Sequence, residues 1–292
     1  MGEPRVSVII IVYNGAAFLA EAVESVLAQT LGDWELLIAD DGSSDASLDI
    51  AAAYAARHPD RIRCLRHPDK GNHGMSATRN LGIAGARGRY IAFLDCDDVW
   101  LPAKLEEQLA VMEARPSLGM IYGRTLIWHG WREGERSGDH FYDLGVEPGQ
   151  DYDPPALLLV LLDNRAQTPT TCNALIRTDL ARAVGGFEPR FRGMFEDQAF
   201  FAKVLLRARV HVSDQCWAKY RQHAASHSAV SARQGDDLGP QVAYLRWFLG
   251  YLLRHDPKPR VVAMVARRLA VQSRWLVRRH VRRGVKRALG RV

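Results

Sequence analysis

The residues best suited to chemistry follow a short apolar run from Tyr90 to Leu94. Three carboxylates, Asp95, Asp97 and Asp98, lie within the next four positions. An apolar run of this length is typical of a buried strand, and ligands of open α/β sheets bind beyond the carboxyl ends of such strands. Acids this close repel one another unless a cation lies among them, which indicates a divalent metal that holds phosphate oxygens. The alternative is that one Asp only caps the following helix.

Polar side chains also end two earlier apolar runs. Tyr13 closes the β-branched run that starts at Val6, and Asp40 and Asp41 follow a run that starts at Glu35. Neither a G-x-G-x-x-G loop nor a Walker A loop is present. Phosphates would therefore be held by metal and basic side chains rather than by a glycine-rich loop, which again points to Asp95 and Asp97.

The elements that must position these residues alternate between strands and helices. Four βα-like units occupy the first 115 residues, which predicts an α/β fold with a mostly parallel, nucleotide-binding sheet. The expected strands are 6–13, 35–39, 62–66 and 90–94, and the expected helices are 16–29, an Ala-rich helix after Asp45, 75–86 and one that begins at Pro102.

The pattern loosens beyond Tyr122. Residues 124–155 mix aromatic residues with glycines, prolines and charges, as a long substrate-facing loop region would. Trp128 and Trp131 would stack there on an acceptor or pack under their own loop. Later elements are expected as a helix at 156–162, strands at 172–176, 210–212 and 217–221, a helix that opens at Glu196, a polar linker at 231–239 and a helical remainder.

Taken together, several motifs resemble those of a known family. The chain resembles family 2 of the inverting glycosyltransferases, which have the GT-A fold, over about residues 5–228. The order and spacing of the motifs carry the resemblance, because each motif alone is weak. They are VSVIIIVYNG at 6–15, LAEAVESVLAQ at 19–29, ADDGSSD at 39–45, Arg79-Asn80-x-Gly82, FLDCDDVWLP at 93–102, Gly185 to Phe187 and Glu196-Asp197.

The resemblance implies a donor site built from five residues. Tyr13 would stack on the nucleotide base, and Asp41 would accept a hydrogen bond from it. Arg79 would meet the diphosphate. Asp97 would be the more direct metal ligand, for Mn²⁺ or Mg²⁺, while Asp95 would contact the ribose or a metal-bound water.

The resemblance also implies a catalytic pair. Asp197 would be the base that takes a proton from the attacking hydroxyl, and Glu196 would orient the acceptor or the base. The structural alternative is that both acids only favour a helix N-terminus. His223 lies where related enzymes often carry a histidine near the diphosphate and metal, or it is a surface histidine.

These assignments predict a metal-dependent inverting glycosyltransferase that moves one sugar from a nucleotide-sugar donor, with UDP favoured, to a glycan or lipid-linked acceptor in cell-envelope polysaccharide or glycoconjugate synthesis. The Q-x-x-R-W motif of processive members is absent, which favours a single transfer. A catalytically inactive nucleotide-sugar or glycan-binding module of the same fold is the alternative. The expected domains are a catalytic domain at 1–230, divided into a donor half at 1–122 and an acceptor half at 123–230, and a helical basic extension at 240–292.

Charge is distributed unevenly along the chain. Residues 254–292 carry 13 Lys or Arg and one acid, a net +12, whereas the remaining 253 residues carry 26 basic and 32 acidic side chains, a net −6. Apolar and basic residues alternate in this tail as in a basic amphipathic helix, which indicates an anionic membrane surface. Nucleic acid is not expected as a partner, because no motif for reading it is present. A plain solvated helix packed on the catalytic domain is the other alternative.

The remaining composition excludes several classes of protein. The chain shows no signal-peptide pattern and no apolar stretch long enough to span a bilayer, so we expect a cytoplasmic protein that is peripheral to the inner face of the membrane. Its four cysteines lack C-x-x-C spacing. Reduced, packed thiols are therefore expected rather than a zinc site or disulfides.

Overall fold

The computed structural model of the chain describes residues 3–132, 138–163, 166, 169–226, 229–230, 233 and 238–288, with side chains up to residue 279. The chain divides into two compact units, Met1–His223 and Ala224–Val292. Each unit is described by itself.

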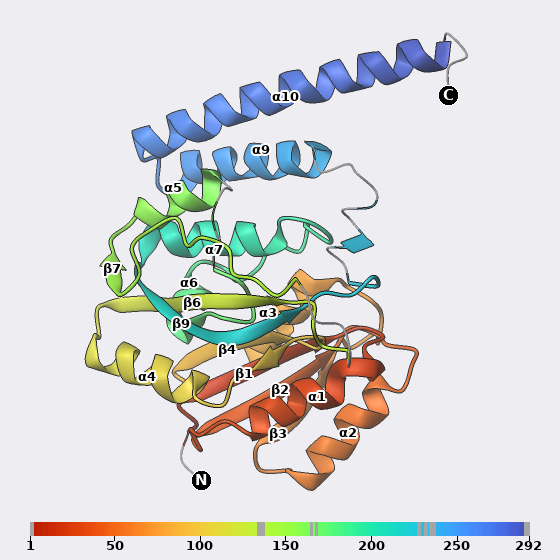
Figure 1. Cartoon of the computed structure of the whole chain (residues 1–292), viewed down its shortest axis with the longest axis vertical. Coiled ribbons are helices and arrows are strands. Elements are labelled where there is room, and N and C mark those ends of the chain that lie inside the picture. Colours follow the sequence, from red (N-terminus) through yellow and green to blue (C-terminus); the bar gives the residue numbers. More distant parts are fainter. Residues whose placement is uncertain are drawn as a thin grey trace. The chain divides into compact units, whose positions relative to one another are not determined.

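The first unit is built on one mixed sheet (Figure 1). Within the described residues, nine strands form this sheet, in the order β3-β2-β1-β4-β8-β6-β9-β5, and β7 pairs with β9. The strands are β1 (Val6–Val12), β2 (Trp34–Asp40), β3 (Ile62–Arg66), β4 (Tyr90–Asp95), β5 (Val99–Trp100), β6 (Leu118–Trp128), β7 (Gln150–Tyr152), β8 (Leu175–Arg177) and β9 (Arg209–Arg221). Strands β1 to β4 pair in parallel, whereas β8 is antiparallel to both of its neighbours. The predicted α/β class is confirmed.

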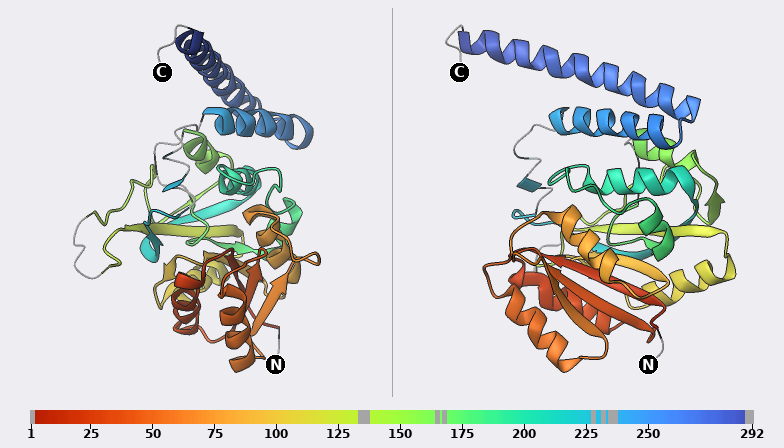
Figure 2. Two further views of the ribbon diagram at one scale, coloured as in Figure 1. Left: turned by 90° about the vertical axis from the view of Figure 1, so that its right-hand side faces the viewer. Right: turned by 180° about the vertical axis from the view of Figure 1, so that it is seen from behind.

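Helices cover both faces of this sheet (Figures 1 and 2). They are α1 (Ala16–Leu27), α2 (Ser47–Arg57), α3 (Met75–Gly85), α4 (Lys104–Ala114), α5 (Ala156–Asp163), α6 (Thr178–Ala183) and α7 (Glu196–Arg207). Successive side chains of a strand point to opposite faces. Val8 and Ile10 of β1 accordingly join the core with Val23 of α1, while Ile9 points towards Gly82 of α3.

Gly82 sets the distance between α3 and the sheet. A Cβ atom at this position would lie 2.4 Å from Cγ2 of Ile9, closer than real side chains approach. On the same face, the Phe187 ring stacks on Phe200 of α7 at 4.1 Å and meets Phe93 of β4 edge-on at 5.2 Å. The glycine of the Arg79-Asn80-x-Gly82 motif therefore lets α3 approach the sheet closely.

The prediction that residues 124–155 form a long loop region is wrong in part. Strand β6 continues to Trp128, and Gln150–Tyr152 form β7. Both segments pair with β9, which is one irregular strand of 13 residues instead of the two short ones predicted. A local sequence pattern does not show these strands, because they are held by pairing with β9, which lies far along the chain.

The described part of the second unit includes the helices α9 (Leu238–His255) and α10 (Pro259–Ala288), which contact one another. Val261 and Val265, near the start of α10, are fully buried. Proline is well tolerated at the first turn of a helix, as Pro259 is here. Among the described residues, we find no helix with the length and apolarity needed to cross a membrane.

Candidate functional site

The strand ends meet as the sequence predicts. Val12 of β1 is level with Asp40 of β2, and Ile11 is level with Asp95 of β4. Tyr13 lies just past the end of β1 with 54% of its surface exposed, although large aromatic side chains are usually buried. An exposed ring at this edge is available to stack on a planar group.

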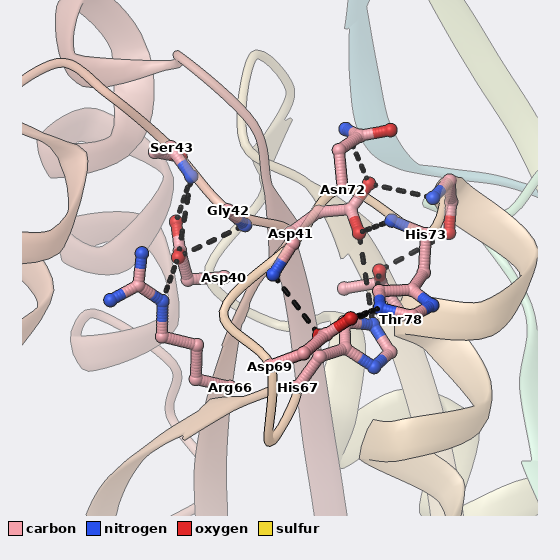
Figure 3. Close-up of polar contacts among 12 residues, drawn as sticks. Asp40, Asp41, Gly42, Ser43, Arg66, His67, Asp69, Asn72, His73 and Thr78 are labelled. Atoms are coloured by element: carbon pink, nitrogen blue, oxygen red, sulfur yellow. Dashed lines mark hydrogen bonds and ion pairs between the residues drawn. The ribbon is translucent and has the colours of Figure 1, made fainter.

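Asp41 lies beside the loop formed by residues 67–74 (Figure 3). Its Oδ1 accepts a hydrogen bond from the backbone N–H of His73 at 2.8 Å, and its Oδ2 accepts bonds from Nδ2 of Asn72 and N–H of Gly74, both at 2.9 Å. Gly42 has φ +81°, and a Cβ there would lie 2.8 Å from the backbone of Gly71. Asp41 therefore anchors a loop that lies close to the turn after β2.

Asp40 shapes the turn beside it. Its carboxylate accepts hydrogen bonds from the backbone N–H groups of Gly42 and Ser43 and lies 3.0 Å from Nε of Arg66. The two neighbouring acids thus have different tasks, because Asp40 holds the turn and Asp41 holds the loop opposite.

Arg79 joins α3 to two carboxylates. Its guanidinium donates a hydrogen bond to Oδ1 of Asp95 at 2.7 Å and lies 3.5 Å from Oε1 of Glu196. Arg79 is almost completely buried, and its guanidinium lies over the Phe187 ring at 5.2 Å. The predicted contact of Arg79 with a diphosphate stays a prediction, and the structure adds a second role, which is to hold Asp95 and Glu196 in place.

Glu196 and Asp197 open α7. The residue before them, Phe195, has φ +73°, which is uncommon for a bulky side chain and is often found near functional sites. Burial, together with the charge of Asp197, raises the pKa of Glu196 to about 8, and Arg79 opposes this rise. Burial also raises the pKa of Asp197. Both acids therefore lie in a place where their charge is poorly solvated.

Asp97 and His223 form a second polar pair. Nε2 of His223 lies 3.0 Å from Oδ2 of Asp97. The main chain around Asp97 is fixed by Arg221, whose Nε donates a hydrogen bond to the Asp97 carbonyl at 2.7 Å and whose N–H donates to Oδ1 of Asp98 at 3.0 Å. His223 is thus a part-buried partner of the acid cluster.

Arg221 lies within a ring of aromatic side chains. Its guanidinium is 4.5 Å from the Trp128 ring, 4.9 Å from the Trp131 ring and 5.1 Å from the Phe18 ring. Trp131 also donates from Nε1 to the Gln222 carbonyl at 2.8 Å. Of the two expectations for the tryptophans, packing within the protein is the one that these contacts support.

Three residues of the site were missed by the sequence patterns. Thr171 donates from its hydroxyl to Oδ2 of Asp95 at 3.0 Å, Arg221 orders the Asp97 main chain, and Asn72 bonds to Asp41. Arg221 could have been suspected from its place two residues before His223. Thr171 and Asn72 carry no comparable signal, because they reach the site only through the fold.

The donor atoms around Asp97 fit a hard divalent cation. Oδ2 of Asp97 and Nε2 of His223 lie 3.0 Å apart, and a carboxylate oxygen and an imidazole nitrogen are both ligand types that divalent metals accept. Both oxygens of Asp95 already accept hydrogen bonds, from Arg79 and Thr171. Within the described ranges no three His, Cys, Asp or Glu side chains gather as a complete metal site. Asp97 and His223 therefore offer one oxygen and one nitrogen, which alone do not complete a metal site.

Asp98 differs from the acids beside it. Its side chain is buried, and burial together with the charges of Asp97 and Asp95 raises its pKa well above the ordinary value. Because it accepts a hydrogen bond from the Arg221 backbone, Asp98 ties the end of β9 to the acid cluster.

Similar proteins identify the family to which this site belongs. The model of glycosyl transferase family 2 matches residues 7–185. An uncharacterized glycosyltransferase of Nostoc sp. is 30% identical over 263 residues, which cover 86% of this chain and 79% of the relative. The putative teichuronic acid biosynthesis glycosyltransferase TuaG of Bacillus subtilis is 38% identical over 125 residues, which cover 43% of this chain and 48% of TuaG.

Solved structures share the fold. The structure of S. aureus TarS 1-349 in complex with UDP-GlcNAc matches with a TM-score of 0.71 at 19% identity, covering 92% of this chain and 72% of that one. The mannosyltransferase PcManGT from Pyrobaculum calidifontis, in complex with GDP-Man and Mn²⁺, matches with a TM-score of 0.59 at 16% identity, covering 99% and 81%. The match to the longer TarS structure covers 43% of that chain. The predicted GT-A fold is confirmed, and because the family model matches more than half of the sequence, the chain belongs to glycosyl transferase family 2.

Proposed function

We propose that the chain transfers one sugar, with inversion, from a nucleotide-sugar donor to a glycan or lipid-linked acceptor in cell-envelope polysaccharide synthesis. The observation that carries this proposal is the convergence of Asp95, Arg79 and Glu196 with Asp197 at the carboxyl edge of a parallel sheet. The titles of TarS and PcManGT name UDP-GlcNAc and GDP-Man as their ligands, and TuaG is described as an enzyme of teichuronic acid biosynthesis. UDP remains the favoured nucleotide.

On the donor side, Tyr13 would stack on the base and Asp41 would accept a hydrogen bond from it. Oδ1 of Asp41 accepts one bond within the protein, so it has capacity for another. Asp97 and His223 would hold Mn²⁺ or Mg²⁺, which supplies positive charge against the diphosphate leaving group. The presence of Mn²⁺ in the PcManGT complex supports this assignment.

On the acceptor side, Asp197 would act as the base. The acceptor oxygen forms a bond to the anomeric carbon as the bond to the diphosphate breaks, and the hydroxyl proton passes to the Asp197 carboxylate. Burial raises the pKa of Asp197, which makes it a better proton acceptor than a solvated aspartate. Glu196, held by Arg79, would orient the acceptor or the base.

Residues 240–292 would bring the enzyme to the inner face of the membrane, next to a lipid-linked acceptor, while residues 1–230 would form the catalytic domain. On α10, Trp275 and Val277 are exposed beside Arg274 and Arg278. A helix that exposes apolar and basic side chains together suits an anionic lipid surface. The predicted basic positions beyond residue 279 lie outside the described side chains.

A donor panel tests the proposal. Binding and hydrolysis of UDP-, GDP- and dTDP-sugars are measured with and without Mn²⁺ on the wild type and on Asp97→Asn. We expect one donor to be selected in a metal-dependent way, with the selection lost in the variant. Binding without any turnover, even with candidate acceptors present, would favour the inactive binding module instead.

A further inference from the structure

The segment 187–192, which leads into α7, is bonded to α3 at two places. Asn80 of α3 makes a pair of hydrogen bonds with the Phe187 backbone, accepting from its N–H at 2.7 Å and donating to its carbonyl at 2.9 Å. Ser76 donates from its hydroxyl to the Phe191 carbonyl at 3.0 Å. The segment that leads to Glu196 is therefore hydrogen-bonded to α3, the helix that carries Arg79.

Arg192 extends this attachment to the loop before α3. Its guanidinium donates to two oxygens of Asn72, the backbone carbonyl at 2.9 Å and Oδ1 at 2.8 Å. The same side chain passes close to Gly74, where a Cβ would lie 3.2 Å from Nε of Arg192. Gly74 has φ +88°, so this position favours glycine both for its backbone and for the space that Arg192 occupies.

Asn72 connects Arg192 to Asp41. With Oδ1 bonded to Arg192, the amide of Asn72 has Nδ2 directed to Oδ2 of Asp41 at 2.9 Å (Figure 3). One arginine therefore fixes both the main chain and the amide orientation of Asn72. The loop that it fixes supplies the hydrogen bonds that hold Asp41 in place.

We infer that Arg192 is a positioning residue for recognition of the nucleotide base. It clamps Asn72, and through Asn72 it fixes the carboxylate of Asp41 and the edge of the base subsite. This inference rests on the proposed function, because it requires a nucleotide base to bind at Asp41. Arg192 lies four residues before Glu196. The segment 187–192 therefore also links the base subsite to the start of α7.

The bonds of Arg192 differ from those of a nearby arginine. Arg190 lies 3.9 Å from the carboxylate of Glu188, a distance typical of weak surface ion pairs. Both arginines are exposed and lie in the same segment. Replacing Arg190 therefore serves as a matched control, because it removes the same side chain without touching Asn72.

Ligand binding tests the clamp. Dissociation constants for UDP, GDP and pyrophosphate, each with Mn²⁺, are measured by calorimetry on the wild type, Arg192→Ala, Arg190→Ala and Arg192→Lys. We expect Arg192→Ala to weaken binding of the preferred nucleotide roughly tenfold, the effect of about 1.4 kcal/mol, while pyrophosphate binding stays within about twofold. Arg190→Ala should match the wild type. Arg192→Lys should recover part of the loss, because an ammonium can still donate to Asn72.

Two results would overturn the inference. Unchanged nucleotide binding in Arg192→Ala would show that the clamp has no role in base recognition. An equal loss for nucleotide and pyrophosphate would show a general structural defect, which a lowered melting temperature would accompany. If wild-type protein binds neither UDP nor GDP, the proposed donor site itself is wrong, and that outcome is distinct from either of the other two.

Discussion

Two acidic regions of the site are built in opposite ways. At Asp41, one carboxylate receives hydrogen bonds from three N–H groups, two of them from the main chain. Around Arg79, three carboxylates share one guanidinium, and burial raises the pKa of two of them, Glu196 and Asp197. The Asp41 carboxylate is well supplied with hydrogen-bond donors, whereas the carboxylates around Arg79 share few. A carboxylate held by several donors suits positioning, whereas a poorly solvated one suits proton transfer.

The largest expected effect comes from removing the charge of Asp197. Asp197→Asn should lower kcat by about 10³-fold, within the range for losing a general base, with little change in nucleotide affinity. Stability should rise, because a poorly solvated carboxylate becomes neutral. Steady-state kinetics and thermal melting check both parts, and Asp60→Asn, an exposed acid outside both α7 and the loop at 67–74, is the control. A fall in kcat of less than tenfold would remove Asp197 from the role of base.

Removing the shared cation should cost stability. Arg79→Met keeps much of the side-chain volume but removes the positive charge next to Asp95 and Glu196. Breaking a buried ion pair in this way typically costs about 3–5 kcal/mol. Urea denaturation measures the loss, and Arg87→Met should cost less, because Arg87 is exposed and the buried Glu35 keeps Arg63 as a second partner. Equal losses in the two variants would mean that Arg79 is not the cation on which this region depends.

The stability of the region around Arg79 and Glu196 should also depend on pH. Burial raises the pKa of Glu196 from 4.5 to about 8, so between these values the folded protein retains a proton that the unfolded chain has lost. The free energy of unfolding should therefore fall as pH rises from about 4.5 to about 8, by at most about 1.4 kcal/mol per unit. Denaturation of the wild type and Glu196→Gln across this window checks the effect, and the two curves should converge at low pH. Parallel curves would contradict it.

The smallest effect is expected at Asp41. In Asp41→Asn, one side-chain oxygen is replaced by an amide nitrogen that cannot accept hydrogen bonds from the loop. The loss should be about 1–3 kcal/mol of stability, the usual cost of an unsatisfied buried group. Hydrogen exchange at the amides of His73 and Gly74 would report whether the loop is released. Unchanged exchange at both amides would show that the loop does not depend on Asp41.

Sequence patterns predicted the features that depend only on residues close together in the chain. The strand ends at Tyr13, Asp41 and Asp95 follow from runs of apolar residues that break at a polar one, and the structure brings them to one edge. The contacts that complete the site join positions far apart in the chain. Thr171 reaches Asp95 across 76 positions and Arg221 reaches Asp97 across 124, and no periodicity records such pairings.

Strand β9 is a second feature that local sequence patterns do not predict. The sequence predicts two short strands, because Ser213 to Cys216 interrupt the apolar pattern, whereas the pairing with β6 continues on both sides of this interruption with shifts in register. Pairing geometry thus overrides a local pattern, as is common in sheets. For the same reason, the sequence left two alternatives open for Trp128 and Trp131, because their partner Arg221 lies in the strand that the pattern divides.

The close approach of α3 to β1 at Gly82 limits how this enzyme can change. A single methyl group at position 82 would have to displace Ile9 or the whole helix, and with the helix would move Arg79 and Asn80, three and two residues earlier. The positions of Arg79 and Asn80 therefore depend on how closely α3 packs against β1. The loop at 67–74 lies outside this contact, and Arg192 joins it to the segment that leads into α7.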